Sequence, residues 1–172
     1  MDLPETPGRR DDVDPQFSLE VGGMLCVGCR PAGRCRFGLR LEHVGDAPSV
    51  AGTAQLGPEH EGAGGVAHGG SVMSILDEAC GAVPIAAGVL AVTAQLSTRF
   101  RRPVPLERTL EVRAWADSRD ERGRWQVRAE IGLPGATTAL ASAEALFVER
   151  DPAQHYGRFR TWLDGEGTER AS

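Results

Sequence analysis

One segment, residues 69–84, limits the possible folds because it has the period of a single long helix with two unlike sides. Its apolar residues recur three and four positions apart, as on the buried side of an α-helix: Val72, Ile75, Leu76, Ala79, Cys80 and Val83. The opposite side carries small residues and carboxylates: Gly70, Ser74, Asp77 and Gly81, flanked by Ser71 and Glu78. Because a solvent-facing side normally carries more charges, we expect a ligand, a partner helix or both to approach it.

The limits of this helix are marked by glycine and proline. Gly69 and Gly70 indicate its start. Pro84 indicates its end or a kink, because proline removes a helical N–H donor and clashes with the preceding turn.

The remaining regular segments have strand character, with β-type alternation and short turns between them. They cover residues 37–41, 49–56, 92–101, 109–116, 123–133 and 139–149. In the segment 109–116, the residues Leu110, Val112, Ala114 and Ala116 share one face. The order of strand, strand, helix and four strands predicts an α+β fold with an antiparallel sheet curled around one helix. A parallel doubly wound sheet would need more helices.

The length of 172 residues suits one domain, which we place at residues 21–150. Residues 1–20 hold six acidic residues, two Arg and three Pro, the composition of a disordered arm. Residues 151–172 form a tail in which the aromatic spacing predicts a short docking helix. These aromatic residues are Tyr156, Phe159 and Trp162.

Composition excludes several classes of protein. With 24 acidic against 19 basic residues the net charge is -5, which disfavours nucleic-acid binding. All basic residues are Arg, which excludes Schiff-base lysine chemistry and a P-loop lysine. The charged N-terminus has no secretory apolar run, so we expect a cytoplasmic protein with free thiols. The uncharged run 79–98 has too short an apolar part to span a membrane.

The glycine-rich approach to the helix, residues 62–70, points to a site. It leads into a helix N-terminus whose first amides lack intrahelical partners, and glycine lets another molecule reach them. Such an end binds anions and developing oxyanions. Phosphate is one possible guest, although no phosphate-binding motif is present, and a carbonyl oxygen is the other. Asp77 is a candidate base or nucleophile, with a solvated surface carboxylate as the alternative.

Three runs of sequence resemble one family. They are HGGSVMSILDEA at 68–79, AVTAQL at 91–96 and FRRPVP at 100–105. Together they resemble the hotdog-fold acyl-CoA thioesterases, which are PaaI-like and belong to the 4-hydroxybenzoyl-CoA thioesterase superfamily. The acid nine residues after His68, the strand with Thr93 and the R-P-V-P turn are more specific than HGG alone. The resemblance covers about residues 24–150 and implies a hotdog fold, with a curved antiparallel sheet wrapped around one long central helix.

The resemblance also implies roles for individual residues. The amide of Gly69 would polarise the thioester carbonyl, and Asp77 would act as the nucleophile or as the general base that activates water. Thr93 would lie near the attacking water, and His68 would position the loop. Gly70 and Glu78 would belong to the substrate-binding side, with Glu78 as an alternative acid. Some relatives carry Asn or Gln at the position of Gly62, so His60 or Glu61 would have to orient water or thiolate here.

Further side chains are weaker candidates. Arg99, Arg101 and Arg102 suit coenzyme A phosphates, with a solvated strand end as the alternative. Four residues could bind zinc, but their spacing is irregular, so we expect packed thiols and no metal. These four are Cys26, Cys29, Cys35 and His43. The pocket wall is assigned to Met73, Cys80 and Leu96, whereas Trp115 and Trp125 are expected only to pack.

The spacing of the two main candidates predicts an oligomer. Gly69 and Asp77 are separated by about 12 Å along one helix, too far to act on the same carbonyl. If two copies pack their small-residue sides antiparallel about a two-fold axis, Asp77 of one copy approaches Gly69 of the other. We therefore expect a homodimer, or a homotetramer of two dimers, with sites between subunits.

Two functions from different classes fit the sequence. The first is hydrolysis of an acyl-CoA or acyl-carrier-protein thioester to free acid and thiol. It needs no cofactor, since coenzyme A is part of the substrate. The second is a non-catalytic hotdog protein that binds an acyl thioester or another hydrophobic ligand, which the missing polar side chain at Gly62 favours. A hydratase would need an Asp/His arrangement that the sequence does not show.

Overall fold

The computed structural model describes residues 29, 32–151 and 154–155. The chain divides into two units, residues 19–151 and a second unit made of residues 1–18 and 152–172. The fold described here is that of the first unit. The arm predicted at residues 1–20 lies outside the described residues, as do Tyr156, Phe159 and Trp162 of the predicted docking helix.

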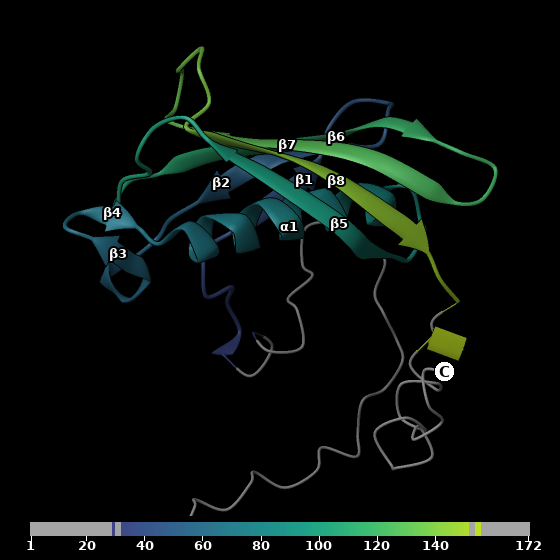
Figure 1. Ribbon diagram of the computed structural model, residues 1–172, viewed down its shortest axis with the longest axis horizontal. Coiled ribbons are helices and arrows are strands. Elements are labelled where there is room, and N and C mark those ends of the chain that lie inside the picture. The colour runs from purple at the N-terminus through teal and green to yellow at the C-terminus, as the bar shows by residue number, and fades with distance from the viewer. Residues whose placement is uncertain (1–28, 30–31, 152–153, 156–172) are drawn as a thin grey trace, which may run out of the picture. The chain divides into compact units, whose positions relative to one another are not determined.

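In the described residues of this unit, one α-helix packs on a six-stranded antiparallel sheet (Figure 1). The helix α1 spans Gly69–Ala86 and lies against one face of the sheet. The sheet has the strand order β1-β2-β6-β7-β8-β5. Its strands are β1 (Arg40–His43), β2 (Ser49–Ala54), β6 (Leu110–Arg119), β7 (Arg124–Gly132), β8 (Ala141–Glu149) and β5 (Ala91–Phe100). The predicted α+β arrangement of one helix on an antiparallel sheet is confirmed.

The core lies between α1 and the sheet. All six residues of the predicted helical stripe are buried, with at most 1% of their surface exposed. The sheet buries every second residue of a strand on the helix side. In β6 these residues are Leu110, Val112 and Ala114, which point toward α1 and are buried. Burial of this apolar surface is the main favourable term in folding and fixes which side of α1 faces the sheet.

Several element ends differ from the prediction, and three of them have a clear physical reason. The helix continues two residues past Pro84 and ends at Ala86. Because Pro84 lies in the last turn, its missing N–H removes only one hydrogen bond near the helix end. Gly88, just past this end, has a positive φ of 75°. Strand β1 begins at Arg40 rather than at residue 37, because Gly38 has a φ of 58°, which interrupts an extended strand. Strand β6 runs on to Arg119 across a bulge after Ala116.

The glycine-rich segment contains structure that the sequence did not predict. A 3-10 turn at Pro58–His60 leads into a two-stranded hairpin of β3 (Glu61–Ala63) and β4 (Val66–Ala67), which ends directly before α1. This hairpin determines where the N-terminus of the helix lies. Among the described residues, no helix has the length and apolar character that a membrane span requires.

Candidate functional site

His68 holds the start of α1 in place. It is the N-cap residue, and its Nδ1 accepts a hydrogen bond from the N–H of Gly70 at 2.9 Å. Its own N–H donates to the carbonyl oxygen of His60 at 2.7 Å, which ties the helix start to the 3-10 turn. This geometry suits the loop-positioning role that the resemblance implies for His68.

Gly69 carries the free amide of the helix N-terminus. The amides of Gly70, Ser71 and Val72 all donate to atoms of His68, either the side chain or the carbonyl oxygen. The N–H of Gly69 has no acceptor in the part of the chain that the structure describes. It lies at the positive end of the helix dipole, so it is suited to a carbonyl oxygen on which negative charge develops.

The R-P-V-P turn braces the loop in front of Gly69. The N–H of Ala67 donates to the carbonyl oxygen of Val104 at 2.9 Å, and the N–H of Leu106 donates to Gly65 at 3.2 Å. Val66 and Pro105 form a bridge between the same two segments. The sequence contained both motifs, but no local pattern indicated that they contact one another.

Position 62 has no room for a side chain. A Cβ on Gly62 would lie 2.7 Å from the Cα of His68, so the hairpin passes too close to the helix start. The carboxylate of Glu61 accepts a hydrogen bond from the N–H of Gly65 at 2.6 Å. The His60 ring is buried, 5.3 Å from the ring centroid of Phe37. His60 is therefore enclosed beside Phe37, whereas Glu61 is exposed and holds the hairpin turn through one carboxylate oxygen.

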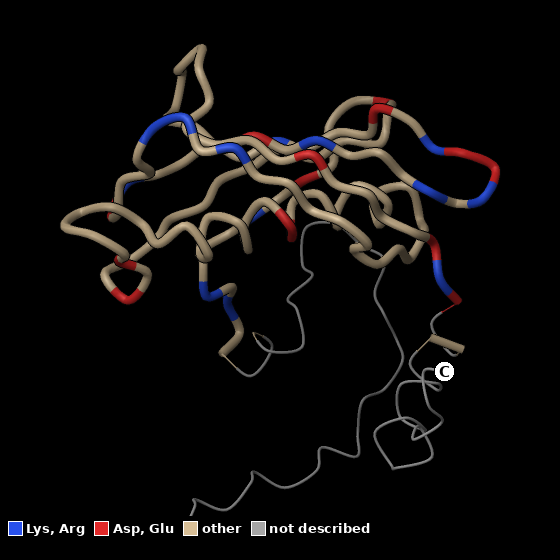
Figure 2. The backbone as a smooth tube through the Cα atoms, viewed as in Figure 1, with Lys and Arg blue, Asp and Glu red and all other residues tan. Residues whose placement is uncertain are grey.

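Asp77 and Thr93 are brought together by the packing of α1 against β5. The Thr93 hydroxyl donates to Oδ1 of Asp77 at 2.9 Å, across 16 positions of the sequence. Since Thr93 occupies only one carboxylate oxygen, Oδ2 keeps its acceptor capacity. Asp77 and Glu78 are the only charged residues of α1 (Figure 2). Their proximity therefore concentrates the charge of the helix at one point.

Burial and Asp77 perturb two neighbouring groups. Glu78 has an exposed side chain overall, yet its pKa is raised from 4.5, first by desolvation and then by the charge of Asp77. The pKa of the Cys80 thiol is raised to about 12 by the same two causes in the same order. Cys80 therefore stays protonated at neutral pH.

The three residues predicted for the pocket wall lie in different environments. Cys80 has no exposed surface and packs in the core, whereas Met73 is 37% exposed on α1. Leu96 is half-buried and packs against the core. Of the predicted small-residue side, Gly81 faces the sheet rather than solvent, since a Cβ there would lie 3.3 Å from the Phe147 ring. The close neighbour of Gly81 is thus a residue of the same chain.

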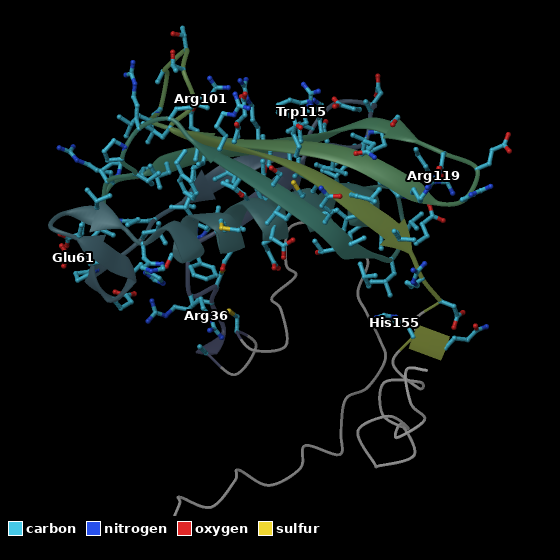
Figure 3. All side chains as sticks on the ribbon, in the orientation of Figure 1. Arg36, Glu61, Arg101, Trp115, Arg119 and His155 are labelled. Carbon is cyan, nitrogen blue, oxygen red and sulfur yellow. The ribbon has the colours of Figure 1, made fainter. Side chains whose placement is uncertain are left out.

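Two of the three arginines at the end of β5 face away from α1. Phe100 pairs with the buried residue Ala141 and so faces α1, whereas Arg99 pairs with Ser142 and faces the other side. Arg101 also lies on the side of the sheet away from α1 (Figure 3). Arg99, Arg101 and Arg102 are exposed and form no ion pair with a described residue.

The tryptophans and cysteines take packing positions. Trp125 is buried and its Nε1 donates to Glu149 at 2.8 Å, while the half-buried Trp115 donates to Asp117 at 3.2 Å. Cys29 is buried, Cys35 is half-buried, and Cys26 lies outside the described residues. Among the described residues, no three His, Cys, Asp or Glu side chains form a group that could hold a metal ion.

Comparison with known protein sequences points to one family. The thioesterase superfamily pattern matches residues 64–130, which include the hairpin turn, α1 and β5. A bovine protein (Bos taurus) named acyl-coenzyme A thioesterase THEM4 is 29% identical over 119 residues. The match covers 67% of this chain and 48% of the bovine protein, so the chain spans about half the length of that relative.

Solved structures give the same result for the fold. A crystal structure of a thioesterase superfamily protein is 35% identical, with a TM-score of 0.58 and coverage of 63% of this chain and 54% of that one. The Escherichia coli PaaI protein of the phenylacetic acid degradation operon is 18% identical, with a TM-score of 0.62, and the match covers 72% of this chain and 85% of that one. A Streptococcus mutans protein bound to acetyl CoA is 23% identical, with a TM-score of 0.57, and the match covers 65% of this chain and 90% of that one. The hotdog fold and the predicted resemblance are confirmed.

The close approach at Gly62 predicts a difference between two glycines of one hairpin. Gly62→Ala should lower the melting temperature and speed amide exchange at Gly69 and Gly70, because its Cβ displaces the backbone of His68. Gly64→Ala is the matched control, since a Cβ there meets nothing within 4 Å. Thermal unfolding and hydrogen exchange measure both effects. Equal behaviour of the two variants would contradict the assigned contact.

The shifted pKa values of Glu78 and Glu149 predict that a Glu→Gln change at these two positions alters the melting temperature in opposite directions at neutral pH. The raised pKa of Glu78 means that ionisation destabilises the fold, so Glu78→Gln should raise the melting temperature at pH 7. The gain should vanish near pH 3, where Glu78 is neutral in both states. Hydrogen bonds from Arg119 and Trp125 lower the pKa of Glu149, so its carboxylate stabilises the fold until pH falls through that lower value. Glu149→Gln should therefore lower the melting temperature at pH 7.

Proposed function

We propose that this chain, in which residues 64–130 belong to the thioesterase superfamily, hydrolyses the thioester of an acyl-CoA to a free acid and coenzyme A. The observation that carries the proposal is the N–H of Gly69, which has no acceptor among the described residues and stands at the start of the same helix that holds the Asp77–Thr93 pair. The bovine relative is named for this activity, and one structural neighbour is bound to acetyl CoA. Both support coenzyme A as the carrier, with a carrier protein as the other candidate.

Gly69 acts on the carbonyl oxygen. As the thioester carbon is attacked, negative charge builds on this oxygen, and the amide together with the helix dipole stabilises it. The other first-turn amides are already held by His68, so the donor directed at substrate is Gly69. A single donor of this kind raises kcat on the order of 10²-fold to 10³-fold.

Asp77 supplies the second group. As a general base it takes a proton from water while the water oxygen bonds to the thioester carbon, and the C–S bond then breaks to release the thiolate. As a nucleophile its oxygen forms the bond to carbon, the thiolate leaves, and water cleaves the resulting anhydride. In both routes the Thr93 hydroxyl orients the carboxylate through Oδ1 and leaves Oδ2 for the reaction.

A second copy of the chain completes the site. Gly69 and Asp77 of one helix are separated by about 12 Å, so they cannot meet on one carbonyl. Strand β5 supports the assembly: it is a ten-residue edge strand with its outer edge unpaired among the described residues, and long free edges favour pairing with another chain. An antiparallel two-fold arrangement brings Asp77 of the second copy to Gly69. The assembly is a dimer or a dimer of dimers.

Binding without turnover is a second candidate function. It is favoured by position 62, where the hairpin leaves no room for a polar side chain to orient water or thiolate. The helix N-terminus would still bind a thioester carbonyl in that case.

Substitution of Asp77 separates the two functions. Thiol release is measured over acyl-CoAs from acetyl to long-chain and aromatic, and over acyl-carrier-protein thioesters. Asp77→Asn should lower kcat by at least about 100-fold, because the amide can neither attack nor take a proton, while substrate binding is kept. Asp117→Asn on β6 is the control, since Asp117 is paired with Arg128 outside the site. Binding by the wild type without any turnover would favour the binding protein.

Mixed dimers test whether the site lies between two copies. Gly69→Pro removes the N–H at a helix position that tolerates proline, whereas Gly69→Ala keeps it. A heterodimer of one Gly69→Pro and one Asp77→Asn chain has one intact intersubunit site and should show about half the wild-type activity. Each variant alone should be nearly inactive. A heterodimer as inactive as its parents would place both residues in the same subunit's site.

A further inference from the structure

Phe100 is an exposed aromatic residue on the side of the sheet that faces the helix. It is the last residue of β5, and 48% of its surface is exposed, the largest fraction among the large apolar residues in the described part of the chain. Its partner across the sheet, Ala141, is fully buried. The ring therefore lies on the α1 side of the sheet, where most apolar side chains are buried.

The ring lies on the side of Gly69 where a Cβ would stand. Its Cζ lies 3.4 Å from the position that a Cβ on Gly69 would take, and two more ring carbons lie within 4.0 Å of that position. The ring thus lies near the residue whose N–H has no acceptor in the described part of the chain. A carbonyl oxygen that accepts this N–H lies about 3 Å from the nitrogen, so the carbons bonded to that carbonyl come within reach of the ring.

The neighbours of Phe100 along β5 on this side are uncharged. The residues of β5 that share its face are Ala91, Thr93, Leu96 and Thr98. The charged group further along this face is the Asp77 carboxylate bound by Thr93. Arg99 and Arg101 lie on the opposite side, away from α1. A charged group beside the ring would lose its water without gaining an ionic partner, whereas methylene groups would gain apolar contact.

We propose that Phe100 contacts the acyl group of the substrate and selects acyl groups whose first carbons are apolar over those with a second carboxylate. The proposal rests on the hydrolase function proposed above. It assigns the ring to the acyl side of the thioester rather than to coenzyme A, because Arg99 and Arg101, two of the three arginines suited to phosphates, lie across the strand.

Two substrates of equal chain length test this selection. We compare kcat/KM for butyryl-CoA and succinyl-CoA in the wild type, Phe100→Ala and Phe100→Leu. The wild type should prefer butyryl-CoA. Phe100→Ala should lower kcat/KM for butyryl-CoA about tenfold and change it much less for succinyl-CoA. Phe100→Leu should keep most of the preference, because leucine restores apolar surface.

Three further measurements define the control. Leu133→Ala removes an exposed apolar side chain from the turn after β7 and should leave both kcat/KM values unchanged. The inhibition constant of free coenzyme A should be the same in the wild type and Phe100→Ala, since the ring does not contact the leaving group. Light scattering should show the same oligomer for every variant.

Several outcomes would overturn the proposal while the hydrolase function stands. In the first, the wild type is active and Phe100→Ala keeps the ratio of kcat/KM for butyryl-CoA to that for succinyl-CoA. In the second, Phe100→Ala lowers kcat/KM equally for both substrates and free coenzyme A inhibits it more weakly. In the third, kcat/KM falls equally for both substrates and the oligomer changes. A wild-type protein that hydrolyses no thioester would instead overturn the proposed function, and this proposal with it.

Discussion

The burial of one helical stripe against the sheet fixes every position on which the site depends. With Val72, Leu76 and Val83 buried, α1 can take only one rotation about its axis. That rotation directs Asp77 toward β5, where the Thr93 hydroxyl reaches its carboxylate. It also brings the first residue of the helix beside Phe100 at the end of the same strand. The apolar core thus positions polar groups that contribute little to it.

The start of the helix is defined by a second set of contacts, made almost entirely by backbone atoms. His68 accepts the amides of the first turn and leaves that of Gly69 without an acceptor among the described residues, while the R-P-V-P segment holds the hairpin that leads into the turn. An unpaired donor at a helix end is unfavourable in an ordinary fold. Here it is kept next to an apolar ring and near a small-residue surface, which is the environment in which a single amide acts most strongly on a carbonyl oxygen.

The sequence predicted well those features that depend on local periodicity. The helix start at Gly69, the buried stripe and the alternation of β6 follow from side-chain spacing, and all agree with the structure. The resemblance to known thioesterases placed Thr93 near the attacking water, but the hydrogen bond between Thr93 and Asp77 was not predicted, since 16 positions separate the two residues. The positions of Gly81 beside Phe147 and of Arg99 across the strand from Phe100 were not anticipated. Both depend on how strands pair, which spacing along one strand does not reveal.

By itself the sequence determined the element types, the buried side of the helix and the chemical groups available for catalysis, because each is set by residue type and period. Only the tertiary structure decided which groups meet. The brace between Ala67 and Val104, the lack of room at Gly62 and the position of Phe100 near Gly69 arise from chain segments far apart in sequence. Their distances follow from the packing of one helix on six strands, a constraint that acts on the whole core at once.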